Sequence, residues 1–167
     1  MEKVLVSVIM GSQSDLPVME RAFDTLRGFG IPFETRILSA HRTPAEVEAY
    51  ARGAAGRGVR VIIAAAGMSA ALPGVIAAQS PLPVVGVPVK GMLDGLDALL
   101  SMAQMPPGVP VATVGVNAAA NAALLAVRIL ALGDAQTARQ LEAFREEQRR
   151  KVLKADEEVI KSKQADE

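Results

Sequence analysis

The chain has 167 residues, with 18 Lys plus Arg against 18 Asp plus Glu, one His and no Cys. A chain of this length fits one domain that buries about 70% of its unfolded surface, so it needs no disulfide or zinc for stability. The lack of cysteine excludes thiol catalysis, and the zero net charge with only one Tyr and four Phe argues against a nucleic-acid partner.

Membrane insertion and secretion are also not expected. Half of the residues are hydrophobic, but Gly, Pro and polar residues interrupt each apolar stretch before the ~20 residues that a bilayer span requires. The first three residues lead into a strand-like run and not into the apolar segment and cleavage site of a secretory signal. We therefore expect a cytoplasmic protein.

Strand-like and helix-like segments alternate regularly along the chain. Apolar, often β-branched runs predict strands at residues 4–10, 33–38, 59–65, 82–88 and 109–116. Helical patterns occupy about residues 16–29, 43–56, 72–79, 93–102 and 121–132. The third strand is apolar almost throughout, which is typical of a strand covered on both faces. The alternation predicts right-handed βαβ units in an α/β domain, with a doubly wound parallel sheet between two helical layers.

The C-terminal segment has a different character. Residues 135–163 form a charged helical pattern with sparse apolar positions at Ala138, Leu141, Phe144, Val152 and Val159. Such a helix is either solvated and laced with salt bridges or packed on another subunit. Residues 96–105 and 118–132 are apolar around almost the whole helix, which is more apolar surface than one monomer of this size buries. We therefore expect a homo-oligomer. We divide the single domain into a core, 1–134, and a C-terminal helix, 135–167, that packs on neighbouring subunits.

Ligands of doubly wound sheets bind at the carboxyl ends of the strands, where the winding reverses. The turn after the first strand, Gly11-Ser12-Gln13-Ser14-Asp15, offers N–H groups and two hydroxyls that suit a phosphate, and a carboxylate that suits a ribose. The same turn is also a good helix cap without any ligand. It is neither a Walker loop nor the G-x-G-x-x-G dinucleotide pattern.

The turn after the second strand carries His41 and Arg42. Imidazole takes up and releases a proton near neutral pH, so His41 is the default candidate for proton transfer. Arg42 offers a planar fork of donors for a phosphate, although it also suits a surface ion pair. Thr43 and Pro44 form a helix N-cap followed by proline at the first helical position. The turn after the third strand, residues 66–74, is small and nearly uncharged, so it can line a pocket closely.

A set of ordered motifs resembles the N5-carboxyaminoimidazole ribonucleotide mutases of purine biosynthesis, the class I PurE family. The motifs are MGSQSD at 10–15, SAHRTP at 39–44, LPG at 72–74, GVPV at 86–89, QMP at 104–106 and NAALLA at 121–126. The resemblance implies a flavodoxin-like, cofactor-free and metal-free isomerase that assembles as a homo-octamer. It also implies functional coupling to N5-carboxyaminoimidazole ribonucleotide synthetase.

The resemblance further assigns roles to single residues. Ser12, Ser14 and Arg42 would hold the substrate phosphate, Asp15 the ribose, and His41 would shuttle the proton. The other substrate-binding residues would be Ser39, Gly67, Ser69 and Leu72. The reaction would move a carboxyl group from the exocyclic nitrogen to ring carbon C4, by loss and recapture of CO2.

The third turn departs from the family pattern. Mutases usually read Gly-Ala-Gly-Gly-Ala-Ala-His-Leu-Pro-Gly there, whereas this chain has Met68 in place of a glycine and Ala71 in place of a histidine. In this turn the chain is more similar to a carboxylase domain used in making a nickel-pincer nucleotide cofactor. Two alternatives therefore stay open: direct carboxylation of aminoimidazole ribonucleotide by CO2, and a nucleotide-binding relative without catalysis.

Overall fold

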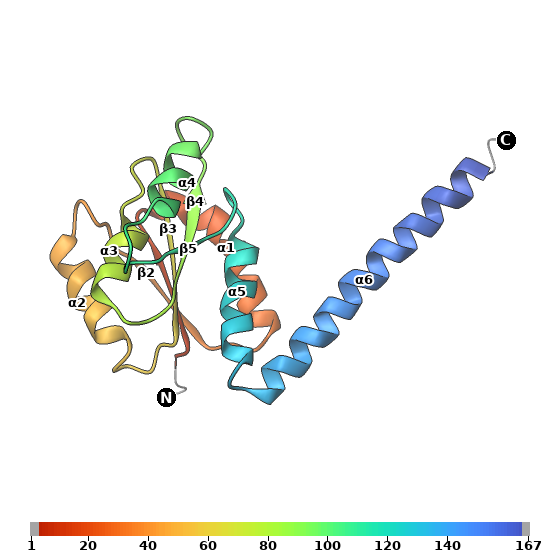
Figure 1. The fold of residues 1–167 in the computed structure, drawn as a ribbon, viewed down its shortest axis with the longest axis horizontal. Helices are drawn as coiled ribbons and strands as arrows, with labels where there is room; N and C mark the ends of the chain where they lie inside the picture. Colours follow the sequence, from red (N-terminus) through yellow and green to blue (C-terminus); the bar gives the residue numbers. More distant parts are fainter. Residues whose placement is uncertain (1–3, 165–167) are drawn as a thin grey trace.

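The computed structural model describes residues 4–164, and its centre is a sheet of parallel strands (Figure 1). The strand order is β2-β1-β3-β4-β5, and every neighbouring pair is parallel. The strands are β1 (Val6–Met10), β2 (Phe33–Ile37), β3 (Val61–Gly67), β4 (Val84–Val89) and β5 (Ala112–Thr113). The predicted doubly wound α/β architecture is confirmed, and the winding reverses between β1 and β3.

Helices cover both faces of the sheet. A short 3₁₀ turn, η1 (Gln13–Asp15), precedes α1 (Leu16–Gly28), and the chain continues with α2 (Pro44–Ala54), α3 (Leu72–Gln79), α4 (Leu96–Ala103), α5 (Ala119–Ala131) and α6 (Ala135–Gln164). One face packs against α1 and α5, and the other against α2, α3 and α4. Alternate residues of β3 enter the two cores, Ile63 facing α1 and α5 and Ile62 facing α2 and α3, which explains why that strand is apolar throughout.

The fifth strand and the fourth helix differ from their sequence patterns for reasons that the backbone shows. The fifth strand was expected over 109–116, but only Ala112–Thr113 pairs with β4, at the edge of the sheet. Pro110 lacks the N–H that a ladder needs. The fourth helix was expected from residue 93 and begins at Leu96, because Leu93, Asp94 and Gly95 take positive φ values of 49°, 54° and 87°. Those dihedrals lie outside the right-handed helix.

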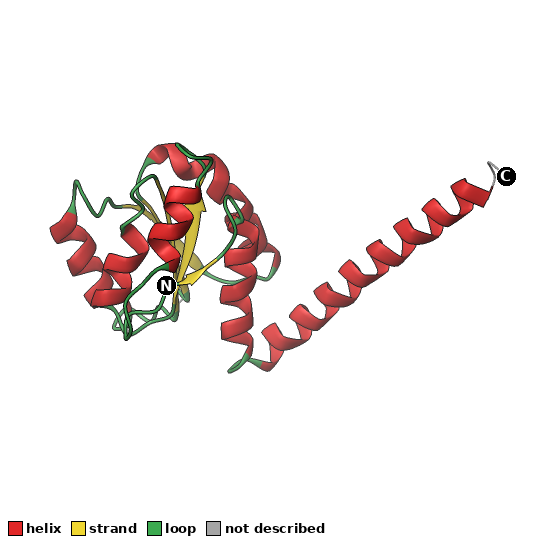
Figure 2. Cartoon of the chain, turned by 45° about the horizontal axis from the view of Figure 1, so that its top comes forward, coloured by secondary structure: helices red, strands yellow, loops and turns green. Residues whose placement is uncertain are grey.

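The last helix, α6, projects away from the body of the domain (Figures 1 and 2). Its first turns are anchored, since Leu141 and Phe144 pack against the core and the Phe144 ring lies 5.6 Å from that of Phe29. Further along, Val152 and Val159 are 69% and 58% exposed. No helix among residues 4–164 is long and apolar enough to span a bilayer.

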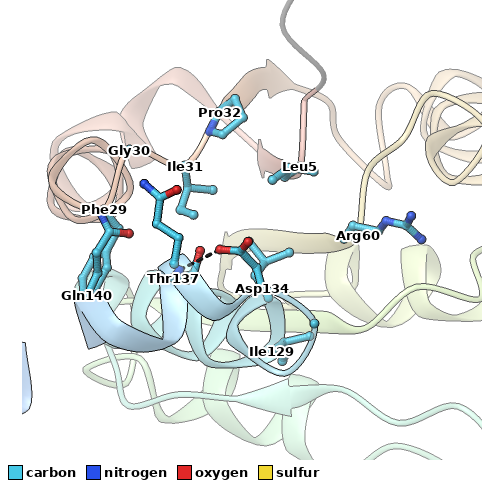
Figure 3. Close-up of a pocket in the computed structure, with 13 residues that line it drawn as sticks. Leu5, Phe29, Gly30, Ile31, Pro32, Arg60, Ile129, Asp134, Thr137 and Gln140 are labelled. Carbon is cyan, nitrogen blue, oxygen red and sulfur yellow. Dashed lines mark hydrogen bonds between the residues drawn. The ribbon is translucent and has the colours of Figure 1, made fainter. Parts of the chain in front are cut away.

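A cavity of about 520 Å³ lies where α6 leaves the body, beside the segments that precede β1 and β3 (Figure 3). Leu5, Ile31 and Ile129 form part of its apolar lining, and Asp134 lines it as well. The Asp134 carboxylate accepts a hydrogen bond from the Thr137 N–H at 2.6 Å. Hydrogen bonding to the Thr137 side chain, and then to the Thr137 N–H, holds the pKa of Asp134 below its usual range. Asp134 is therefore the side chain that caps α6 and fixes its first turn.

Candidate functional site

A second cavity, of about 690 Å³, lies at the carboxyl ends of β1, β2 and β3. It occupies the point where the strand order reverses, which is the predicted ligand position. The predicted site residues all line this cavity: Ser12, Ser14, Asp15, Ser39, His41, Arg42, Gly67, Ser69 and Leu72. Three loops far apart in the sequence thus contribute to one site.

The loop after β1 is held by its own side chains. The Ser12 hydroxyl accepts hydrogen bonds from the N–H and the hydroxyl of Ser14, at 3.3 and 2.9 Å. In return, the Asp15 carboxylate accepts the Ser12 N–H at 3.0 Å, which completes a capping box around η1. The two hydroxyls stay accessible in the cavity wall, next to the start of α1.

Asp15 is the buried carboxylate of the site. The side chain is almost inaccessible to solvent, and desolvation raises its pKa, while the hydrogen bond from the Ser12 N–H opposes that rise. Burial disfavours the charged form of this carboxyl, so keeping it inside the fold costs stability. It nevertheless lines the cavity, where its carboxylate suits the hydroxyl donors of a ribose.

The loop after β2 is closed by Thr43. The Thr43 hydroxyl accepts the Ser39 N–H at 2.9 Å and donates to the Ser39 carbonyl at 3.1 Å, and the Thr43 N–H donates to the same carbonyl at 2.8 Å. Thr43 is the predicted N-cap residue of α2, but its side chain makes no cap hydrogen bond and instead fastens the loop. His41 lies within this closed turn, exposed to solvent at the cavity wall.

Arg42 joins the first two loops. Its Nη2 atom donates to the Gly11 carbonyl at 2.9 Å, and its backbone N–H and Nε donate to the Ser39 hydroxyl at 3.2 and 3.4 Å. The alternative of a surface ion pair is not observed, because within residues 4–164 the hydrogen bonds of this arginine go to Gly11 and Ser39 and to no carboxylate. The guanidinium lines the same cavity as the hydroxyls of Ser12 and Ser14, so this cavity offers a cation together with neutral donors, a combination that suits a phosphate.

The loop after β3 forms the remaining wall. Hydrogen bonds of 2.8 Å from the Ala70 N–H to the Met68 carbonyl, and from the Ala71 N–H to the Ser69 carbonyl, coil it tightly. A side chain at Gly67 would lie 3.3 Å from the Val89 carbonyl oxygen, so this loop rests closely on the end of β4. Among residues 4–164, no group of His, Asp or Glu side chains gathers in a way that would hold a metal ion.

A sequence model of the AIR carboxylase family matches residues 5–151. The chain belongs to this family. The resemblance found in the motifs is confirmed.

Individual members agree with this assignment. The chain is 58% identical over 146 residues to the N5-carboxyaminoimidazole ribonucleotide mutase of Mycobacterium tuberculosis, which covers 87% of this chain and 84% of that protein. It is 55% identical over 161 residues to the phosphoribosylaminoimidazole carboxylase of Saccharomyces cerevisiae, covering 96% of this chain but only 27% of that protein. The chain therefore spans about a quarter of the length of the yeast relative and most of the length of the mycobacterial one.

The fold agrees as well. A crystal structure of Treponema denticola PurE superimposes with a TM-score of 0.84 at 32% sequence identity, over 92% of this chain and 97% of that one. The family's three-layer core and the C-terminal helix are thus both present here.

Sequence reasoning missed two parts of the site. Thr43 was interpreted as a helix cap, and only the folded loop reveals its bonds to Ser39. Met68 was noted as a departure from the family, but its left-handed backbone, with φ of 57°, could not be read from the sequence. Gly11, Ala40, Ala66 and Ala71 complete the lining.

Proposed function

We propose that this chain is an N5-carboxyaminoimidazole ribonucleotide mutase, an isomerase of de novo purine biosynthesis. The observation that carries the proposal is the meeting of His41, Arg42, Ser12 and Ser14 in one cavity at the sheet's switch point. Membership of the AIR carboxylase family, and 58% identity to a mutase of nearly the same extent, support the same reaction.

In this proposal the loops divide the substrate between them. Ser12, Ser14 and Arg42 bind the phosphate, and Asp15 accepts hydrogen bonds from the ribose hydroxyls. Ser39 holds the Arg42 side chain through its hydroxyl. The loop with Gly67 and Ser69, together with the first residue of α3, Leu72, lies along the base and the carboxyl group.

His41 carries the proton through both halves of the reaction. The bond between the exocyclic nitrogen and the carboxyl carbon breaks, CO2 leaves, and imidazolium gives its proton to that nitrogen. Ring carbon C4 then attacks CO2, and the neutral imidazole removes the C4 proton. The proton that His41 gave away is recovered, so one histidine serves as acid and then as base. No ATP, metal or organic cofactor takes part in this scheme.

The proposal extends to the assembly and setting of the enzyme. The exposed apolar side chains of α6, Val152, Leu153, Val159 and Ile160, support packing of this helix on neighbouring subunits in a homo-oligomer, for which we propose an octamer. We place the enzyme in the cytoplasm and couple it to the synthetase that makes its unstable carbamate.

Two substrates offered side by side test the reaction. The purified protein is assayed spectrophotometrically with N5-carboxyaminoimidazole ribonucleotide, and separately with aminoimidazole ribonucleotide plus bicarbonate, without metal or ATP. Conversion of the carbamate at low bicarbonate supports the mutase. Conversion only from the free aminoimidazole and CO2 identifies a carboxylase, and binding without turnover of either identifies a nucleotide-binding relative.

A further inference from the structure

The loop after β3 holds Met68 in an unusual conformation. Its φ of 57° lies in the left-handed region, which residues other than glycine rarely adopt. The side chain is also 61% exposed and lines the cavity that contains His41. Neither the backbone conformation nor the burial of apolar surface favours a methionine at this position. A role of the side chain in the cavity would explain its presence.

Met68 also reaches the neighbouring segment. A Cβ atom placed on Gly91, just after β4, would lie 3.9 Å from the Met68 Cγ. The methionine therefore lines the cavity and also approaches the segment after β4. The other residues of the β3 loop that line the cavity, Gly67, Ser69 and Ala71, are small. Met68 is thus the bulky apolar side chain that this loop contributes to the cavity wall before Leu72, at the start of α3.

The proposed reaction places a special demand on such a wall. Between cleavage of the nitrogen–carbon bond and formation of the C4–carbon bond, CO2 is held by no covalent bond. If it leaves, the exocyclic nitrogen keeps its new proton, C4 keeps its hydrogen, and the product is aminoimidazole ribonucleotide plus free CO2. A site that excludes such side reactions needs a closed, apolar boundary around the neutral gas.

We propose that the Met68 side chain forms the wall that retains CO2 in the cavity until C4 captures it. This inference rests on the proposed mutase function and adds a residue to it. The wall acts through the bulk of the thioether side chain and not through the backbone conformation of residue 68.

The partition of products tests the proposal directly. Each variant receives N5-carboxyaminoimidazole ribonucleotide, and the ratio of aminoimidazole ribonucleotide to carboxylated product is measured after subtraction of decarboxylation without enzyme. Met68→Ala removes the bulk and keeps a side chain at positive φ. Met68→Gly removes the bulk and relieves the backbone, so its Tm should equal or exceed that of the parent. Met68→Leu keeps the bulk and serves as the matched control.

We expect the ratio to rise at least about threefold in Met68→Ala and Met68→Gly, and to stay at the parent value in Met68→Leu. Carbon-14 bicarbonate in the medium should label the product of the first two variants more than that of the parent. An unchanged ratio in Met68→Ala, with a rise in Met68→Gly alone, would overturn the proposal, because backbone freedom would then be the cause. A parent that makes no carboxylated product would instead refute the mutase function itself.

Discussion

Arg42 donates a hydrogen bond from Nη2 to the carbonyl oxygen of Gly11, at 2.9 Å. The bond connects the loop after β2 with the loop after β1, and the two strands lie side by side in the sheet. It fixes the guanidinium in the cavity that the hydroxyls of Ser12 and Ser14 also line, and it uses only part of the donor fork. The remaining N–H groups of Arg42 are available to a phosphate.

Removing this guanidinium should weaken binding of phosphorylated ligand. We expect Arg42→Ala to raise the Kd of the carboxylated ribonucleotide by about 10- to 150-fold, equivalent to about 1.5–3 kcal/mol for a charge-assisted hydrogen bond. Calorimetric titration measures this change. Arg52→Ala is the matched control, since Arg52 pairs with Glu48 on the surface of α2. An unchanged Kd for Arg42→Ala would remove this arginine from the phosphate site.

Replacing the proton carrier should separate binding from catalysis. We expect His41→Asn to bind the carboxylated ribonucleotide with nearly parental affinity and to lose at least about a hundredfold in kcat. Stopped-flow or steady-state absorbance gives kcat, and titration gives the Kd. Retained turnover in this variant would show that another group moves the proton.

Thr43 should act as a positioning residue. Thr43→Val removes the hydroxyl that bonds to both the N–H and the carbonyl of Ser39. The loop around His41 then loosens, and we expect kcat to fall between about tenfold and a hundredfold. The Kd of the product should change far less than kcat. Thr43→Ser keeps the hydroxyl and should restore kcat, and a rate as low as that of the valine variant would argue against this role.

The buried carboxylate of Asp15 should make stability depend on pH. Burial raises its pKa above the ordinary value of 3.8, so between these two pKa values the folded chain holds a proton that the unfolded chain has released. Stability falls as the pH rises through this window, and the penalty remains at neutral pH.

The variant Asp15→Asn removes this penalty. We expect its Tm to exceed that of the parent at pH 7, and the difference to shrink as the pH is lowered to about 4. Differential scanning calorimetry across this range checks the expectation. A difference in Tm that stays constant with pH would mean that the Asp15 carboxyl is not desolvated. Weaker nucleotide binding by the same variant would place Asp15 at the ribose.

Shortening α6 should change the assembly without unfolding the core. A chain ending at Gln148 keeps the packed Leu141 and Phe144 but loses the exposed apolar positions that follow. Light scattering should report a smaller particle, and circular dichroism a folded core. The full-length double variant Val152→Glu, Val159→Glu should also form a smaller particle with a folded core. A full-size assembly from both proteins would make the distal part of α6 a solvated appendage.

The sequence predicted which loops form the site better than it predicted the local conformation of the backbone. The strand and helix alternation was sufficient to bring the loops with Ser12, His41 and Ser69 together, because the carboxyl ends of parallel strands meet at one edge. The conformations of residues 93–95, by contrast, depend on backbone choices that local propensity does not determine.

One buried polar network was also beyond prediction. Ser7 lies within the apolar run of β1, yet its hydroxyl bonds to the Tyr50 hydroxyl, which in turn bonds to Glu34. Burial raises the pKa of Tyr50, and the Arg57 guanidinium lies 4.3 Å from its ring centre. These partners come from β1, β2, α2 and the turn after α2, so only the folded chain reveals how Ser7 is satisfied.

A crystal structure with the carboxylated ribonucleotide bound tests the central claim most directly. The phosphate should lie among Ser12, Ser14 and Arg42, with the C4 carboxyl near the His41 imidazole and the Met68 side chain. Density for the ligand in the cavity beside Asp134, or with its phosphate away from Arg42, would contradict this account of the site.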